Sequence, residues 1–149
     1  MTRIFAIAGL LFVASCGQQN ESAAPQPKNG AAAAPSPAAQ VPPLEGNWKV
    51  ASLGGVPDAA SVGMTASFGN GSATIARGCL KRAWTYTQKR NIVAFTSSPG
   101  GSSNCGSAPG GAEEAAYAAL GEANIVVFSK EGREASLSGT GGTLTLERR

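Results

Sequence analysis

Apolar and polar positions alternate in a series of short segments between residues 44 and 149. Trp48 and Val50 fall on one face of the first segment, and Trp84 and Tyr86 fall on one face of a later one. A period of two is typical of half-buried strands. The pattern predicts strands at residues 47–53, 65–68, 72–77, 83–88, 91–96, 124–129, 135–138 and 143–147.

Turn signals and one helical segment complete this pattern. Gly69-Asn70-Gly71 is a strong hairpin signal between two of the strands. Residues 112–123 have helical period, with Glu113 and Glu114 in the first turn, where the helix dipole favours negative charge. The pattern therefore predicts a mainly β fold, a small antiparallel β-barrel or sandwich of about eight strands with one α-helix.

The chain before this domain has a different pattern. Residues 4–14 form an uncharged apolar run that follows Arg3. Such a run is too short to span a bilayer but has the length of the apolar region of an export signal. It ends in Val13-Ala14-Ser15-Cys16, which resembles the bacterial lipobox. We therefore expect a lipoprotein signal peptide at residues 1–15, although a buried helix of the folded domain is an alternative.

The resemblance to the lipobox implies lipid on Cys16 and a membrane partner. Two or three acyl chains on this cysteine would anchor the protein firmly. The next residue is Gly17, not aspartate, which suggests the periplasmic face of the outer membrane. Residues 16–43 are rich in Ala and Pro and contain no aromatic residue, so we expect a disordered linker. The folded domain is then expected over residues 44–149.

The chain has three cysteines, an odd number. Lipid on Cys16 leaves Cys79 and Cys105, and the cell envelope is an oxidising compartment. A disulfide between them would close a loop of about 26 residues, for which the chain-entropy model gives roughly 3.5 kcal/mol. We therefore predict this disulfide, and two separate buried thiols are the alternative.

Charge and composition exclude several classes of function. The formal net charge is +3, which is too small to indicate a nucleic-acid partner. The chain has no histidine, so catalytic triads and metal sites built on imidazole are excluded. Glu113 and Glu114 are adjacent on the expected helix, so their side chains diverge. We expect a protein that is not an enzyme, binds no cofactor or metal, and is a monomer.

A run of basic residues around the expected second hairpin is the candidate binding site. The run spans 14 residues that contain no acid, with Trp84 and Tyr86 among them. Its members are Arg77, Lys81, Arg82, Lys89 and Arg90. They could form a patch for lipopolysaccharide, anionic lipid or an acidic protein. A solvated barrel rim, with both aromatic residues in the core, is the simpler interpretation.

The order of several short motifs resembles the META domain family, whose bacterial type is a heat-inducible lipoprotein (HslJ). The motifs are Gly46-Asn47-Trp48-Lys49-Val50, Leu53-Gly54-Gly55, Gly78-Cys79, Trp84-Thr85-Tyr86, Cys105 followed by Glu113, Glu114, Tyr117 and Leu120, and Leu144-Thr145-Leu146-Glu147-Arg148. The chain departs from the family at Leu80, where members have asparagine, and at Ser103-Asn104, where they often have Met-Ala. The resemblance implies a small β-rich envelope domain without an established catalytic activity.

This resemblance makes a non-enzymatic, lipid-anchored envelope protein the first functional expectation. Such a protein would act in envelope maintenance or stress tolerance by binding. Small periplasmic inhibitors of bacterial metalloproteases are one alternative, because they also combine a Gly-x-Trp start with a β-barrel and one disulfide. A lipocalin-like carrier of a small apolar ligand is another, and it would need an open cavity in the barrel.

Overall fold

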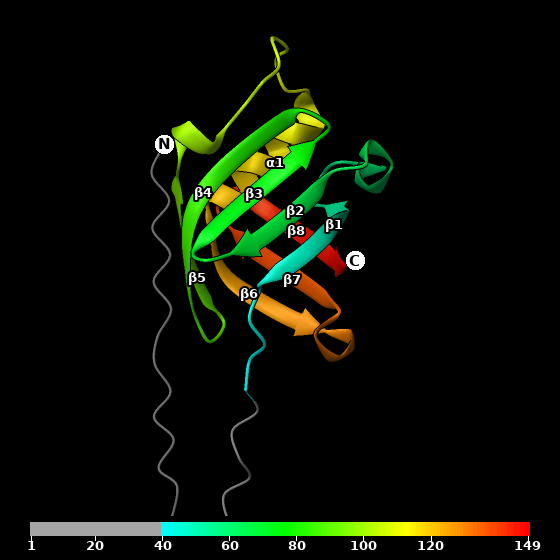
Figure 1. Cartoon of the computed structure of the whole chain (residues 1–149). Helices are drawn as coiled ribbons and strands as arrows, with labels where there is room; N and C mark the ends of the chain where they lie inside the picture. Colours follow the sequence, from blue (N-terminus) through cyan, green and yellow to red (C-terminus); the bar gives the residue numbers. More distant parts are fainter. Residues whose placement is uncertain (1–39) are drawn as a thin grey trace, which may run out of the picture. The chain divides into compact units, whose positions relative to one another are not determined.

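A computed structural model describes residues 40–149, and in it the alternating segments form strands that close into one antiparallel barrel (Figure 1). The strands are β1 (Gly46–Leu53), β2 (Thr65–Gly69), β3 (Ser72–Arg77), β4 (Leu80–Lys89), β5 (Ile92–Ser97), β6 (Ala123–Ser129), β7 (Glu134–Gly139) and β8 (Gly142–Arg148). The same range holds the helix α1 (Gly111–Gly121) and the 3-10 turns η1 (Ala59–Val62), η2 (Pro99–Gly101) and η3 (Lys130–Gly132). The mainly β fold with eight strands and one helix is confirmed. The expected signal peptide, Cys16 and linker residues 16–39 lie outside the described residues.

Each strand pairs with its neighbour in sequence, and β8 returns to pair with β1. The closing pairs begin at Trp48↔Arg148 and end at Leu53↔Leu144. Closure removes the free sheet edges that an open sheet or a sandwich would leave. The structure therefore resolves the choice between barrel and sandwich in favour of the barrel.

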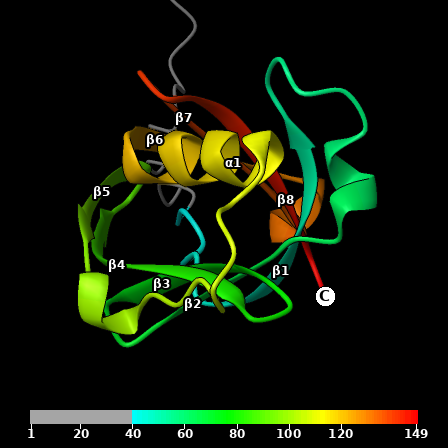
Figure 2. The ribbon, with the colours of Figure 1, turned by 90° about the horizontal axis from the view of Figure 1, so that it is seen from above.

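The contact between β5 and β6 is the exception to this regular pairing. Within residues 40–149, these strands share the single register pair Ile92↔Ile125, next to a 2.8 Å hydrogen bond from the Val126 N–H to the Asn91 carbonyl. The chain between the two strands contains α1, which packs on β5, β7 and β8. Figure 2 shows α1 lying across one end of the barrel, which we call the helix end.

Two glycines allow α1 to approach the turn between β7 and β8. A Cβ atom at Gly139 would lie 1.9 Å from the Glu122 carbonyl oxygen, and one at Gly141 would lie 2.2 Å from the Ala118 oxygen. Any side chain larger than a hydrogen atom would therefore push the helix away from the barrel. These glycines are explained by close packing, not by an unusual backbone angle.

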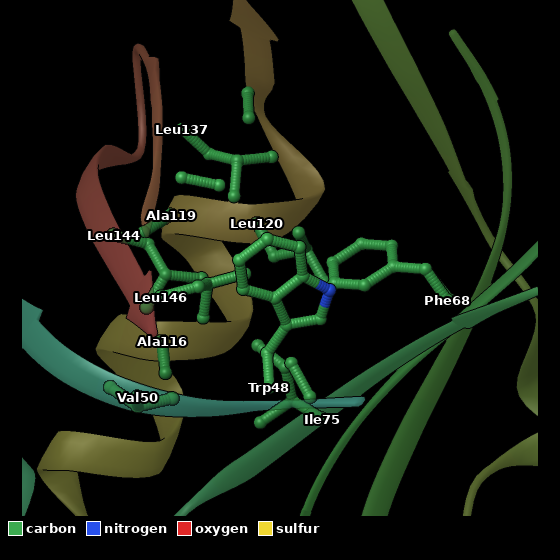
Figure 3. Close-up of a cluster of buried hydrophobic side chains, with 14 of the residues drawn as sticks. Trp48, Val50, Phe68, Ile75, Ala116, Ala119, Leu120, Leu137, Leu144 and Leu146 are labelled. Atoms are coloured by element: carbon green, nitrogen blue, oxygen red, sulfur yellow. The ribbon is translucent and has the colours of Figure 1, made fainter. Parts of the chain in front are cut away.

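Large apolar side chains fill the barrel interior (Figure 3). The largest fully buried ones are Trp48, Leu44, Met64, Ile75, Leu120, Leu137, Leu144, Leu146 and Val126. Trp84 and Tyr86 also belong to this core, as the simpler interpretation of the basic run expects. Interiors are packed about as densely as organic crystals, so a ligand could enter only by displacing these side chains.

Residues 42–44, assigned to the linker or to its boundary from sequence, pack against the barrel end opposite α1. The Leu44 N–H donates to Gln88 Oε1 at 2.8 Å, and Gln88 Nε2 donates to the Pro42 carbonyl at 2.9 Å. Leu44 itself is completely buried. We call this the entry end, because the chain leading from residue 39 enters the barrel here.

Arg148 and Trp48 hold the same segment from the other side. Arg148 donates to the Glu45 carbonyl at 3.0 Å, and its guanidinium lies 4.3 Å from the centroid of the Trp48 ring. The Trp48 indole N–H donates to the Leu44 carbonyl at 2.8 Å. The entry end is therefore closed by the chain's own backbone, and β1 begins directly from it.

Candidate functional site

The structure divides the five basic residues of the expected patch between the two ends of the barrel. Arg77, Lys81 and Arg82 lie at or near the β3–β4 turn, at the helix end. Lys89 and Arg90 lie at the β4–β5 turn, at the entry end. Lys81 and Lys89 are eight residues apart on one strand, a distance of roughly 26 Å. The run therefore does not form one continuous patch.

At the helix end, acidic groups balance the basic ones. Arg77 forms an ion pair with Glu113, whose side chain is 4% exposed. Arg82 lies over the Tyr117 ring, with its guanidinium carbon 5.7 Å from the ring centroid. Asp58, Glu114 and Glu122 add further negative charge near this end. We count three basic and four acidic side chains here, a net charge of −1.

The Arg77–Glu113 pair is expected to be worth about 1–2 kcal/mol of folding free energy. The substitution Arg77→Gln leaves the buried Glu113 carboxylate without its cation, and the half-exposed position of Arg77 keeps the loss below that of a fully buried pair. Urea unfolding followed by circular dichroism measures the loss. Lys81→Gln is the control, because Lys81 is exposed and has no carboxylate partner within residues 40–149. Equal destabilisation by both substitutions would contradict the assignment.

A disulfide joins Cys79 and Cys105 in the structure, with their Cα atoms 6.0 Å apart. It connects the β3–β4 turn to the loop between η2 and α1. Two backbone hydrogen bonds of 2.7 Å between Lys81 and Ser103 support the same connection, and Ser103 Oγ donates to the Cys79 carbonyl at 2.6 Å. This arrangement fixes the loop that precedes α1. It does not expose a reactive thiol.

At the entry end, Lys89 and Arg90 are joined by basic residues that are remote in sequence. The basic side chains here are Lys89, Arg90, Lys130, Arg133 and Arg148, and the acidic ones are Glu45, Glu131 and Glu134. Arg149 lines a groove with Lys49 and Ala60 on the β1–β2 side instead. Five basic and three acidic side chains give this end a net charge of +2. Lys49 and Glu147 form a 2.9 Å ion pair between the two ends and cancel each other. The three cations beyond Lys89 and Arg90 could not be predicted from the sequence, because only barrel closure brings them to this end.

Most of these cations are free of carboxylate partners. Lys130 is the exception, since it forms a 2.6 Å ion pair with Glu134. The hydrogen bond from Lys130 lowers the pKa of the Glu134 carboxyl below its usual range, so this pair stays ionised and neutral overall. Within residues 40–149, Lys89, Arg90 and Arg133 have no carboxylate within ion-pair distance. Their charge is available to a partner.

An exposed apolar strip lies beside this cationic end. Among residues 40–149, the exposed large hydrophobic side chains are Ile92 at 64%, Val127 at 57% and Ile125 at 37%. They stand on the outer face of the β5–β6 contact. An open groove of about 490 Å³ next to them is lined by Gln40–Pro42, Arg90, Asn91 and Val126–Phe128. The alternation of apolar and polar residues in β5 and β6 predicts that these side chains point outward. It does not predict that they lie together beside a cationic turn.

The remaining chemistry of the described part is limited. Glu113 is buried and Glu114 is exposed, so the two adjacent carboxylates lie in different environments. Burial raises the pKa of the Tyr86 hydroxyl, which keeps this side chain neutral. In residues 40–149, no group of three or more Cys, Asp or Glu side chains is placed to hold a metal ion. No helix in the same residues has the length and apolarity needed to cross a bilayer.

No protein-family model, characterised protein or solved structure matches this chain. The resemblance to META domains therefore stays an expectation from the order of the motifs in the sequence. Two features of the described residues remain as candidates for function. They are the unpaired cations of the entry end and the apolar strip that adjoins them.

Proposed function

We propose that this protein is a non-enzymatic, lipid-anchored envelope protein with a META-like barrel, which binds anionic lipid through its entry end. Such binding would serve envelope maintenance or stress tolerance. The observation that carries the proposal is the clustering of unpaired cations around the point where the chain enters the barrel. Arg90 lines the groove formed by Gln40–Pro42, and Gly132, the residue before Arg133, lies against Pro42. Lys89 and Arg90 therefore lie on one side of the entering chain, and Arg133 comes to it from a remote part of the sequence.

Lipid on Cys16 would bring this same end of the barrel toward the membrane. The chain that leads from Cys16 reaches the barrel at Gln40, which lines the groove with Arg90. Near an anionic surface, each lysine or arginine contributes about 1 kcal/mol. Acyl chains and a cationic surface are the two signals that together give stable attachment to a membrane. The cations would thus orient a domain that the lipid already retains.

The filled interior favours binding on the outer surface over transport of a ligand inside the barrel. Leu44, Trp48 and their neighbours occupy the space that a lipocalin-like carrier would need. The inhibitor alternative depends on a free N-terminal trunk. Residues 42–44 are instead bound to Gln88 and the barrel, which leaves only the chain before them for such a role. Neither alternative uses the cations of the entry end.

The proposal predicts that Lys89→Gln with Arg90→Gln weakens binding to anionic vesicles by roughly tenfold or more, since two surface charges are lost. Co-sedimentation of the chain carrying Cys16→Ser, without the signal peptide, measures the affinity. Vesicles of phosphatidylglycerol and phosphatidylethanolamine are compared with phosphatidylcholine vesicles. Raising the salt concentration should weaken the parent in the same way.

The matched control is Lys81→Gln with Arg82→Gln, which removes the same charge from the helix end. We expect this control to bind within about twofold of the parent, because its charges lie far from the entry end. Equal weakening by the two double variants would show that net charge alone acts. No binding by the parent at low salt would refute the proposal.

A further inference from the structure

We infer that Ile92, Ile125 and Val127 form a membrane-inserting strip, which enters the boundary between lipid headgroups and acyl chains of an anionic bilayer. The inference rests on the proposed function and deepens it. It states which side of the barrel meets the membrane, namely the contact between β5 and β6. It also adds an apolar contribution to binding. Salt screens the attraction between charges, but it does not screen this apolar contribution.

The three side chains form one surface. Ile92 and Ile125 are register partners across the β5–β6 contact. Val127 lies two residues further along β6, so it points to the same outer face as Ile125. Their exposed fractions of 64%, 37% and 57% leave this apolar surface in water when the barrel is free in solution. Apolar surface that is gathered on one side of a protein is typical of a binding surface.

The surroundings of the strip fit an anionic bilayer. Lys89 is the register partner of Ile92 within the hairpin, and Arg90 is in its turn, so two cations adjoin the strip. On the β7 side, the partners of Val127 and Ile125 are Ser136 and Ser138, which carry no charge. Apolar side chains flanked by lysine and arginine are the arrangement by which amphipathic surfaces bind anionic lipid.

The position of the chain's entry supports the same occupant. Gln40–Pro42 line one groove together with Arg90 and Val126–Phe128. The chain that would lead back to lipidated Cys16 therefore begins alongside the strip. Anchoring and insertion would act on the same side of the barrel, so a single orientation of the barrel would allow both.

A second copy of the chain fits the strip less well. A stable dimer buries about 800 Å² on each partner, which is far more than three side chains supply. A symmetric pair would also place the same patch against itself, so that Lys89 and Arg90 of both copies would come together. Repulsion between these cations opposes such a contact, while anionic headgroups would neutralise them.

The test uses the unlipidated chain with Ile92→Ser and Val127→Ser on the vesicles described above. We expect binding about tenfold weaker than that of the parent, and the same ratio of affinities in 0.5 M salt. The reason is that the serine pair removes roughly half the surface of two aliphatic side chains, which in the parent would leave water on binding. The conservative pair Ile92→Leu and Val127→Ile should bind like the parent. Circular dichroism of each variant would show whether either pair of substitutions causes a general loss of structure.

A second measurement locates the strip directly. In the variant Ile92→Trp, brominated acyl chains should quench the new tryptophan on binding, whereas Trp48 and Trp84 are buried in the core. Ser67→Trp, on the exposed face of β2, is the control and should not be quenched. Because β2 and β6 lie on opposite sides of the barrel, the pair reports orientation.

The outcomes separate the inference from the proposed function. If the parent does not bind anionic vesicles, the proposed function fails and the inference fails with it. If Lys89→Gln with Arg90→Gln weakens binding but the serine pair does not, and Ile92→Trp is not quenched, the inference alone is overturned. If the serine pair abolishes self-association in ultracentrifugation and leaves vesicle binding unchanged, the strip is a contact between copies and the inference is likewise overturned.

Discussion

Replacement of Trp48 by alanine should lower the free energy of unfolding by about 3–5 kcal/mol, the range for removing a large aromatic side chain from a core. Trp48 is completely buried and stands in β1, beside the strand that closes the barrel. Its indole N–H donates to the Leu44 carbonyl at 2.8 Å, and the Arg148 guanidinium lies over its ring. One substitution thus removes core packing and the closure of the entry end.

Chemical unfolding in urea, followed by far-ultraviolet circular dichroism, measures this effect. A small domain has a free energy of unfolding of only about 5–15 kcal/mol, so Trp48→Ala removes a large share of it. Trp48→Phe is therefore the second variant. It keeps a ring but loses the hydrogen bond to Leu44, and we expect a loss of about 1–2 kcal/mol. A free energy of unfolding for Trp48→Ala within about 1 kcal/mol of the parent value would contradict this account of the core. Such a loss is no larger than that of one typical hydrogen bond.

Removal of the Cys79–Cys105 disulfide should cost about 3.5 kcal/mol of stability. The bridge closes a loop with a sequence separation of 26 residues, and that length sets the entropy lost by the unfolded chain in the loop-closure model. The closed loop contains β4 and β5. Their pairing should therefore form more slowly and open more readily in the reduced protein.

The double variant Cys79→Ser with Cys105→Ser tests this in urea, and the oxidised parent treated with a reductant gives an independent comparison. Reductant should have no effect on the double variant, which controls for any action on the unlinked chain. The double variant and the reduced parent should lose a similar free energy of unfolding, and both should keep the circular dichroism spectrum of the barrel. Unchanged stability in both would show that the Lys81–Ser103 hydrogen bonds suffice to hold the loop.

Strand positions could be predicted from sequence because each half-buried strand carries its own period of two. The alternation of Trp84 and Tyr86 in β4, and the turn at Asn70-Gly71, are local signals that do not depend on the partner strand. The predicted helix at residues 112–123 also has a local signal, and it is found at Gly111–Gly121. These elements follow from neighbouring residues alone.

Features that depend on closure could not be predicted in this way. Gln88 reaches back 44 residues to Leu44, and Arg148 reaches back 103 residues to Glu45. The basic run illustrates the same limit, since Lys81 and Lys89 are close in sequence but stand at opposite ends of β4. Which charges share a surface patch depends on where the strands end and how the barrel closes, so a linear run of charges does not predict a patch.

The bonded entry of the chain into the barrel also has a mechanical consequence. Any tension along the chain before residue 40 first loads the hydrogen bonds of Gln88 and Arg148, and then reaches β1. β1 is hydrogen-bonded to β2 on one side and to β8 on the other. Antiparallel hydrogen bonds lie across the strand direction, so a pull along β1 shears many of them together instead of unzipping them singly. A barrel held in this way resists unfolding by a pull along the chain that precedes residue 40.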